Sequence, residues 1–227
     1  MAVIVFDMDG TLVERETPLA WATNRAIKEL GLSFKDTSYL HKIHAIWKTE
    51  ELFNGIDLKT QKDIYVNKLI PKLIEIEMTD EFYKQMKLFP NVNKLIQELF
   101  RLNYKLMVCT SRDTESTSQL MEYLKIRKYF INVIGTQIGR FIDDKPSPTP
   151  VHYMMKQSGI DKSEQIFTVG DGVKDIQLAK NLNGIGIGVS YEIPENKNKL
   201  LKENPIAVID KFDDILKIRD IIVSNTK

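Results

Sequence analysis

The sequence is poor in cysteine, in net charge and in long apolar runs, and each shortage excludes a class of protein. Cys109 is the single cysteine among 227 residues, so neither an intrachain disulfide nor a cysteine-based zinc site can form. One cysteine is typical of a protein from a reducing compartment. The 32 basic and 31 acidic residues leave a formal net charge of +1, so no strong overall field points to a nucleic-acid or anionic-membrane partner.

Long apolar runs are absent too, and none approaches the ~20 residues that a membrane-spanning helix needs. The apolar segment 1–6 has no basic lead and is too short for a signal peptide. We therefore expect a cytoplasmic protein without a membrane partner. Hydrophobic residues make up 43% of the chain and charged residues 28%, which is the balance of an ordinary globular protein.

Short, continuous apolar runs recur along the chain and indicate buried parallel strands, because both faces of a parallel sheet are covered. Helical patterns lie between most of these runs. The alternation predicts an α/β fold with a doubly wound, mostly parallel sheet. The expected strands are 2–6, 105–109, 130–134, 165–169, 186–189 and 207–209.

Local signals place several helix ends. Thr149 followed by Pro150 predicts an N-cap and a proline in the first turn, and Gly159 is expected to end that helix. A second helix is expected at 173–183. The polar run 195–199 is interpreted as an exposed loop.

The alternation stops between about residue 17 and residue 86, where the pattern is helical throughout. Thr17 and Pro18 signal a helix start and Gly31 its end. A parallel sheet rarely tolerates so long a detour between its elements. We therefore predict an α/β core formed by 1–14 and 89–227, with an inserted all-helical domain at 15–88. Its further helices are expected at 37–52, 59–76 and 79–86.

An acidic pair directly follows the first expected strand. Asp7 and Asp9 point the same way if the extended backbone continues, because alternate side chains of a strand share a face. Ligands of open α/β sheets bind beyond the carboxyl ends of the strands. Two neighbouring carboxylates repel unless a cation lies between them or one is protonated. The alternative is an ordinary pair of acidic loop residues near a helix start.

Three further polar groups follow later strands or loops. Thr110 and Ser111 end the second strand, where a hydroxyl and backbone amides can hold a phosphate oxygen or cap the next helix. Lys145 suits a site that holds phosphate and carboxylate together, although a loop lysine is often only solvated surface. Asp171 and Asp175 are about one helical turn apart and can face one point. Oxygen-only ligands select a hard cation such as Mg²⁺, while acids are also favoured at any helix N-terminus.

The order acid pair, hydroxyl, lysine, acid pair resembles the four motifs of the haloacid dehalogenase-like hydrolase superfamily, in its phosphoglycolate phosphatase-like branch with a helical cap. The resemblance covers almost the whole chain. It rests on Asp7-Met8-Asp9-Gly10-Thr11, Thr110, Lys145 and the segment from Gly170-Asp171 to Asp175, with supporting similarity at 147–150 and at Leu178-Ala179. One departure is Gly172, where many relatives have a hydroxyl or a larger polar residue.

The resemblance implies the catalytic roles. Asp7 would attack phosphorus and become an aspartyl-phosphate, and Asp9 would protonate the leaving oxygen and then activate the hydrolytic water. Thr110 would hold a phosphate oxygen with help from the Ser111 backbone, and Lys145 would neutralise charge on the nucleophile and the phosphoryl group.

The resemblance also implies a cofactor and a specificity loop. Mg²⁺ would be held by Asp7, the backbone carbonyl of Asp9 and Asp171, with Asp175 as a ligand or as support. The turn around Asn54 and Gly55 is similar to the cap loop that contacts substrate in the family.

The expected function is therefore hydrolysis of a small phosphorylated metabolite by a monomer or homodimer. Asp9 argues against dehalogenation, because the dehalogenase branch lacks this second acid. A phosphomutase resembling β-phosphoglucomutase is the alternative, and Pro18, Trp21 and Arg112 disfavour it, since those relatives have a histidine and a lysine in these regions. A non-catalytic binding protein on the same fold is a third hypothesis.

Overall fold

The chain folds as two compact units, Met1–Val13 with Lys87–Lys227, and Glu14–Met86. The computed structural model describes residues 2–33, 60, 63–136, 143–191 and 193–226. Within this part of the chain, no helix combines the length and the apolar composition needed to cross a bilayer.

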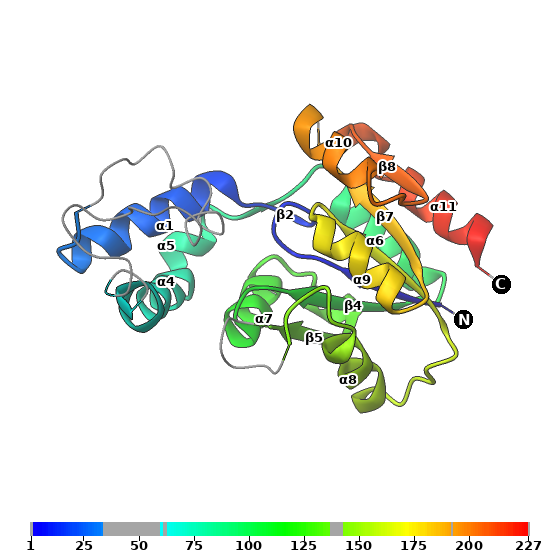
Figure 1. The fold of residues 1–227 in the computed structure, drawn as a ribbon, viewed down its shortest axis with the longest axis horizontal. Helices are drawn as coiled ribbons and strands as arrows, with labels where there is room; N and C mark the ends of the chain where they lie inside the picture. The colour runs from blue at the N-terminus through cyan, green and yellow to red at the C-terminus, as the bar shows by residue number, and fades with distance from the viewer. Residues whose placement is uncertain (1, 34–59, 61–62, 137–142, 192, 227) are drawn as a thin grey trace. The chain divides into compact units, whose positions relative to one another are not determined.

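The larger unit is built on a six-stranded sheet with the order β5-β4-β1-β6-β7-β8 (Figure 1). Every neighbouring pair runs parallel, so the predicted fold class is confirmed. Each expected strand agrees with the observed bounds to within one residue. The strands are β1 (Ala2–Phe6), β4 (Lys105–Thr110), β5 (Phe130–Gly135), β6 (Gln165–Gly170), β7 (Ile185–Val189) and β8 (Ala207–Ile209).

The strand order reverses on either side of β1. The chain adds β4 and β5 on one flank of β1 and then crosses to β6 on the other. In open α/β sheets this kind of switch point is where ligands bind, beyond the carboxyl ends of the strands. The loops that follow β1, β4 and β6 therefore meet at one edge of the sheet.

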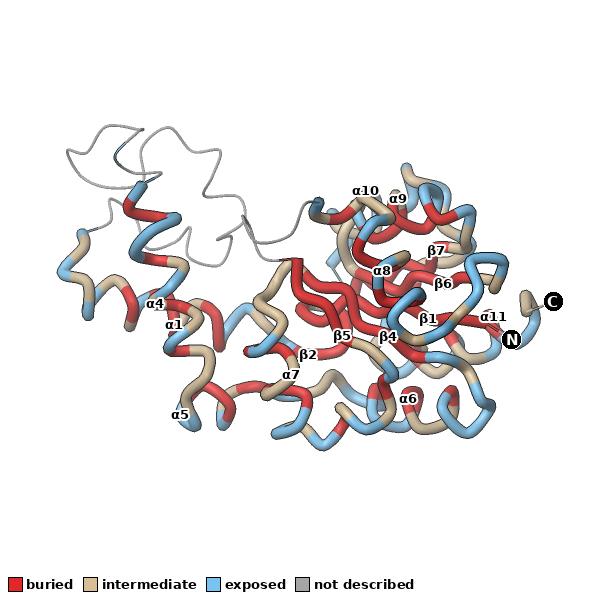
Figure 2. Tube along the Cα trace, turned by 90° about the horizontal axis from the view of Figure 1, so that it is seen from below, coloured by how far each residue is buried: buried red, intermediate tan, exposed pale blue. Residues whose placement is uncertain are grey.

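Helices cover both faces of this sheet, and the strands between them are buried (Figure 2). On one face, α8 (Thr149–Gln157) and α9 (Val173–Asn181) pack against the strands. Val3, Val5 and Met107 form one core cluster with side chains of these two helices. On the other face lies α6 (Val92–Arg101), against which α11 (Lys217–Asn225) packs. The remaining helix beside the site, α7 (Thr114–Tyr123), packs on β5.

Two local predictions about this unit are wrong. Thr149 is not an N-cap, because α8 already includes it and Pro148 takes the N-cap position. The run 195–199 is not a loop but lies within α10 (Pro194–Leu201), which begins with a proline and buries Leu200 completely. Because Leu200 is the one buried side chain of this polar segment, the sequence shows almost no repeat of apolar residues at helical spacing.

The smaller unit is helical in its described part. It contains α1 (Glu16–Glu29), the π-helix η2 (Tyr65–Leu69), α4 (Ile70–Glu77) and α5 (Asp80–Tyr83). α1 packs on α4, with apolar side chains such as Ala22, Leu69 and Ile76 fully buried. The short strands β2 (Val13–Glu14) and β3 (Lys87–Leu88) pair as a separate two-stranded sheet. The expected helix 37–52 and the loop at Asn54 and Gly55 lie outside the described residues.

Candidate active site

The first motif leaves β1 in a tight turn that is tied to the neighbouring strand. The Asp7 backbone N–H donates to the Val169 carbonyl at 2.9 Å, and Gly10 donates to Val13 at 3.0 Å. Gly10 has a φ of +75°, which favours glycine. A Cβ atom at this position would overlap the carboxylate of Asp171. The turn therefore brings the first and the fourth motif into direct contact.

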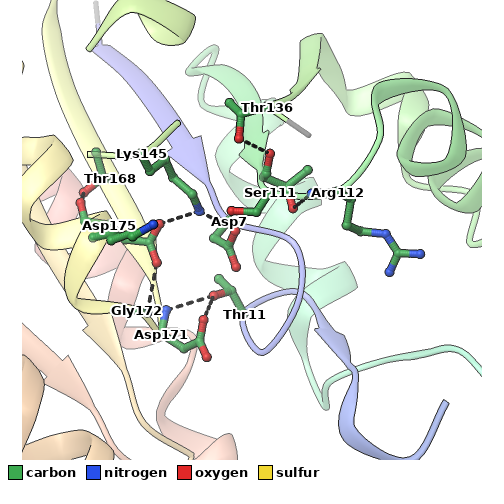
Figure 3. A network of polar contacts seen from close by, with 12 residues as sticks. Asp7, Thr11, Ser111, Arg112, Thr136, Lys145, Thr168, Asp171, Gly172 and Asp175 are labelled. Carbon is green, nitrogen blue, oxygen red and sulfur yellow. Dashed lines mark hydrogen bonds and ion pairs between the residues drawn. The ribbon is translucent and has the colours of Figure 1, made fainter. Parts of the chain in front are cut away.

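Lys145 joins two carboxylates beneath the surface. Its Nζ donates to Asp7 Oδ1 at 2.6 Å and to Asp175 Oδ1 at 2.7 Å. All three side chains are less than a tenth exposed. Figure 3 shows the lysine reaching between the two acids. A buried ammonium is tolerated because two carboxylates compensate its charge.

The fourth motif is organised by the start of α9. Asp175 Oδ2 accepts from the Gly172 backbone N–H at 2.9 Å, a helix-capping contact that a glycine N-cap allows. Thr11 Oγ1 accepts from the Asp171 backbone N–H at 3.0 Å. Both contacts are drawn in Figure 3. The first closes the start of α9, and the second joins the loop after β6 to the loop after β1.

Three carboxylates of this site are close enough to share one cation. One oxygen each from Asp7, Asp171 and Asp175 lie within 4.8 Å of one another. Mg²⁺ prefers oxygen ligands and keeps several of its waters. These three carboxylates offer only oxygen ligands and follow two neighbouring strands. Such a set of ligands fits a hard cation.

The second motif lies at the end of β4, next to the loop that carries Lys145. Thr110 is buried, and its Oγ1 accepts from the Arg112 backbone N–H at 3.4 Å. Ser111 Oγ donates to Asp144 Oδ1 at 3.4 Å. The alternative interpretation of this pair as a helix cap is wrong, because Asp113 caps α7 through the amides of residues 115 and 116.

Asp9 has a charged partner that the sequence did not reveal. Arg112 Nη1 donates to Asp9 Oδ1 at 2.9 Å, and both side chains are 7% exposed. A buried carboxylate held by a guanidinium keeps its charge in a protein interior. The sequence showed Arg112 only as a difference from phosphomutases.

Burial changes the proton affinity of the groups around Lys145. It raises the pKa of Asp7 to about 7, with the charge of Lys145 acting in the opposite direction. Burial also opposes the charge on Lys145, but Asp175 and Asp7 outweigh it and hold the pKa of the lysine well above 10.5. Burial raises the pKa of the Cys109 thiol to about 12, so this neighbouring cysteine is a neutral packing residue.

Other residues that support the site were not identified from the sequence. Tyr191 donates its hydroxyl to the Thr11 carbonyl at 2.7 Å, and Asn196 donates to the Asp171 carbonyl at 3.0 Å. Both follow β7, far along the chain from their partners, so no local signal pointed to them. Asp144 is different, since a carboxylate directly before Lys145 was a visible signal.

The chain is similar to known proteins over most of its length. The family model described as haloacid dehalogenase-like hydrolase matches residues 4–189. A phosphoglycolate phosphatase from Photorhabdus laumondii is 29% identical and covers 94% of this chain and 90% of its own. Another from Vibrio parahaemolyticus is 25% identical and covers 95% of both chains. The crystal structure of a predicted phosphoglycolate phosphatase from Haemophilus somnus has a TM-score of 0.67 at 25% identity, covering 96% of this chain and 97% of that chain.

Proposed function

The chain belongs to the haloacid dehalogenase-like hydrolase family and is a phosphatase of its phosphoglycolate phosphatase-like branch, and on this premise we propose that it hydrolyses a small phosphomonoester through an aspartyl-phosphate on Asp7. The observation that carries the proposal is the contact of Lys145 Nζ with Asp7 and Asp175 at the switch point of the sheet. An ammonium at 2.6 Å from the nucleophile offsets the negative charge that would otherwise repel a phosphate ester.

In the first half of the reaction, an Asp7 carboxylate oxygen forms a bond to phosphorus while the bond from phosphorus to the ester oxygen breaks. Asp9 gives its proton to that leaving oxygen, so an alcohol departs. The backbone amides and hydroxyls around Thr110 and Ser111 hold the phosphoryl oxygens during transfer. Phosphoryl transfer needs mainly such positioning and charge neutralisation.

In the second half, Asp9 takes a proton from water, and the water oxygen bonds to phosphorus as the bond to Asp7 breaks. Inorganic phosphate leaves, and both acids return to their starting states. The Arg112 guanidinium lies 2.9 Å from Asp9 and favours its ionised form. This supports Asp9 as the base of the second half, and it means that Asp9 has to take up a proton before it acts as the acid of the first half.

The cofactor proposed for this site is Mg²⁺. Asp7, the Asp9 backbone carbonyl and Asp171 would hold it, and bound Mg²⁺ would supply charge neutralisation and orientation of the phosphoryl oxygens. We assign Asp175 the supporting part, because both of its oxygens already accept hydrogen bonds, from Lys145 and from Gly172.

The proposed substrate class is a small phosphorylated metabolite with phosphoglycolate as the first candidate. This follows from the names of the two curated relatives, which match over nearly the whole chain. The turn around Asn54 and Gly55 was expected to contact the substrate, and that expectation stays a prediction, as does the monomeric or homodimeric state.

The decisive experiment is a screen of small phosphate esters with Mg²⁺, using wild type and Asp7→Asn. Asn is nearly isosteric but is a poor nucleophile, so turnover should vanish while the circular dichroism spectrum and the melting temperature remain close to wild type. Near-normal rates in Asp7→Asn would refute the assignment. Product release that needs a sugar bisphosphate activator would favour the phosphomutase instead.

A further inference from the structure

Asp144 lies directly before Lys145, and none of the roles proposed above belongs to it. Its carboxylate accepts four hydrogen bonds. The donors are Thr136 Oγ1 at 2.6 Å, the Lys145 backbone N–H at 2.7 Å, Ser111 Oγ at 3.4 Å and Lys174 Nζ at 3.2 Å. One side chain thus contacts residues from the second, third and fourth motif regions.

The short contacts of Asp144 lead to the edge of the sheet. Thr136 follows β5, and its backbone N–H donates to the Thr110 carbonyl at 2.8 Å. Its Oγ1, which donates to Asp144, lies 3.1 Å from the same carbonyl oxygen. Thr136 is itself buried, and Figure 3 shows it beside the Ser111 segment. The Lys145 backbone is therefore attached, through Asp144 and Thr136, to the end of the strand that carries Thr110.

This attachment matters because the Lys145 ammonium has to be held at a defined position. A lysine has a flexible four-carbon stem, yet its Nζ makes contacts at 2.6 and 2.7 Å with two carboxylates. The hydrogen bond from the Lys145 backbone N–H to Asp144 fixes the backbone at this position. The lysine side chain then loses less conformational freedom when its ammonium binds the two carboxylates. The Asp144 carbonyl also accepts from Ser147 at 2.9 Å, so the turn is closed on both sides of Lys145.

The charge of Asp144 is stabilised within this network. Burial acts to raise its pKa, but the hydrogen bond from Thr136 and the charge of Lys174 outweigh it and keep the pKa below the ordinary value of 3.8. The Lys174 side chain is 59% exposed, and an exposed ion pair is weak, so this contact does little to fix the position of the Asp144 carboxylate. The buried donors, Thr136 and the Lys145 amide, define the geometry.

We propose that Asp144 is a positioning residue, which holds the Lys145 ammonium and the Ser111 loop in the arrangement that binds the phosphoryl group. The inference rests on the proposed function in one respect, namely that Lys145 and the Ser111 loop contact phosphate. Asp144 itself touches neither the substrate nor the reacting atoms in this scheme.

The neighbouring residue offers a matched control. Asp143 carries the same charge in the same loop but is exposed. Its carboxylate accepts only from the hydroxyls of Ser147 and Thr149 among the contacts recorded for the described residues. Asp143→Asn therefore removes a charge beside the site without removing a contact to Lys145 or Ser111.

The test compares Asp144→Ala, Asp144→Asn and Asp143→Asn with wild type. Three quantities are measured with Mg²⁺ present: kcat/KM for p-nitrophenyl phosphate, the dissociation constant of inorganic phosphate by calorimetry, and the melting temperature. Asp144→Ala should lose roughly 10- to 100-fold in both kcat/KM and phosphate affinity, the range for removal of an outer partner. Asp144→Asn should lose less, because an amide oxygen still accepts from Thr136 and Lys145. Asp143→Asn should match wild type.

Two results would overturn the inference. One is that the Asp144 variants equal Asp143→Asn in both kcat/KM and phosphate affinity. The other is that activity falls only with the melting temperature while phosphate affinity is kept. If Asp144→Ala does not fold, Thr136→Val decides, since it removes the 2.6 Å donor at constant shape and should weaken phosphate binding. A wild-type protein that binds phosphate but cleaves no ester would count against the proposed function, and the phosphate affinities would still decide the role of Asp144.

Discussion

Arg112 and Asp9 form an ion pair that is almost entirely removed from water, with both side chains 7% exposed. Two charges in that position lose their hydration, and their mutual attraction and hydrogen bonds offset the loss only while both are present. The pair therefore ties the chemistry of Asp9 to the stability of the fold.

We predict that Arg112→Met lowers the free energy of unfolding by about 3–5 kcal/mol, the cost of removing one partner of a buried ion pair. Adding Asp9→Asn to Arg112→Met should return part of that loss, because the carboxylate charge that Arg112 compensated is gone. Urea denaturation of wild type, both single variants and the double variant measures the coupling. Arg25→Met is the control, since its pair with Glu29 lies at the surface and should change stability far less. Strict additivity of the two site substitutions would rule out this role of the pair.

At the scale of elements, the site depends on turns that bring strand ends together. The turn after β1 approaches the loop after β6 so closely that a Cβ atom on Gly10 would overlap Asp171. Within that loop, a Cβ atom on Gly170, the last residue of β6, would overlap Asp175. Glycine is required at these positions because another residue's side chain would occupy the space of a functional carboxylate.

Gly10→Ala and Gly159→Ala separate crowding from backbone strain. Both glycines have positive φ, +75° and +64°, so each alanine pays about 1–2 kcal/mol for a left-handed backbone. Only Gly10 has a neighbour in the way, since nothing lies within 4 Å of a Cβ atom built on Gly159. Gly159→Ala should keep its kcat/KM, while Gly10→Ala should lose on the order of 10²-fold through displacement of Asp171. Equal kcat/KM values for the two variants would show that the close approach of Gly10 to Asp171 does not affect catalysis.

At the scale of the whole molecule, the acids of the site come from distant parts of the sequence. Asp7 follows β1 and Asp171 follows β6, which are neighbours in the sheet although most of the sequence separates them. An unfolded chain does not hold these carboxylates within 4.8 Å, so a cation that needs them binds the folded state.

Mg²⁺ should accordingly stabilise the protein. At a free concentration of 100 times its dissociation constant, a ligand of the folded state adds about 2.7 kcal/mol, which for a chain of this size raises the melting temperature by roughly 5–10 °C. The rise should disappear with EDTA and in Asp171→Asn, and persist in Asp161→Asn, whose carboxylate accepts from Ser163 in an exposed loop. An undiminished rise in Asp171→Asn would remove this residue from the metal site. Calorimetric melting curves provide the measurement.

The amino-acid sequence by itself determined the strands and the positions of the site acids along them. Buried parallel strands are continuous apolar runs, and that property is local, so all six were found to within a residue. Asp7, Thr110 and Asp171 were found for a related reason, since each lies directly at or after the end of such a run.

Only the tertiary structure decided which groups meet. The bond from Lys145 to Asp175, the pair of Arg112 with Asp9 and the support of Asp171 by Asn196 all join residues from different loops. Such contacts depend on how strands and helices pack, and no spacing along the chain encodes them. The helix at 194–201 was missed for the same reason. Its one buried leucine stabilises a helix only through packing against the folded sheet, and a single apolar residue gives no periodic pattern in the sequence.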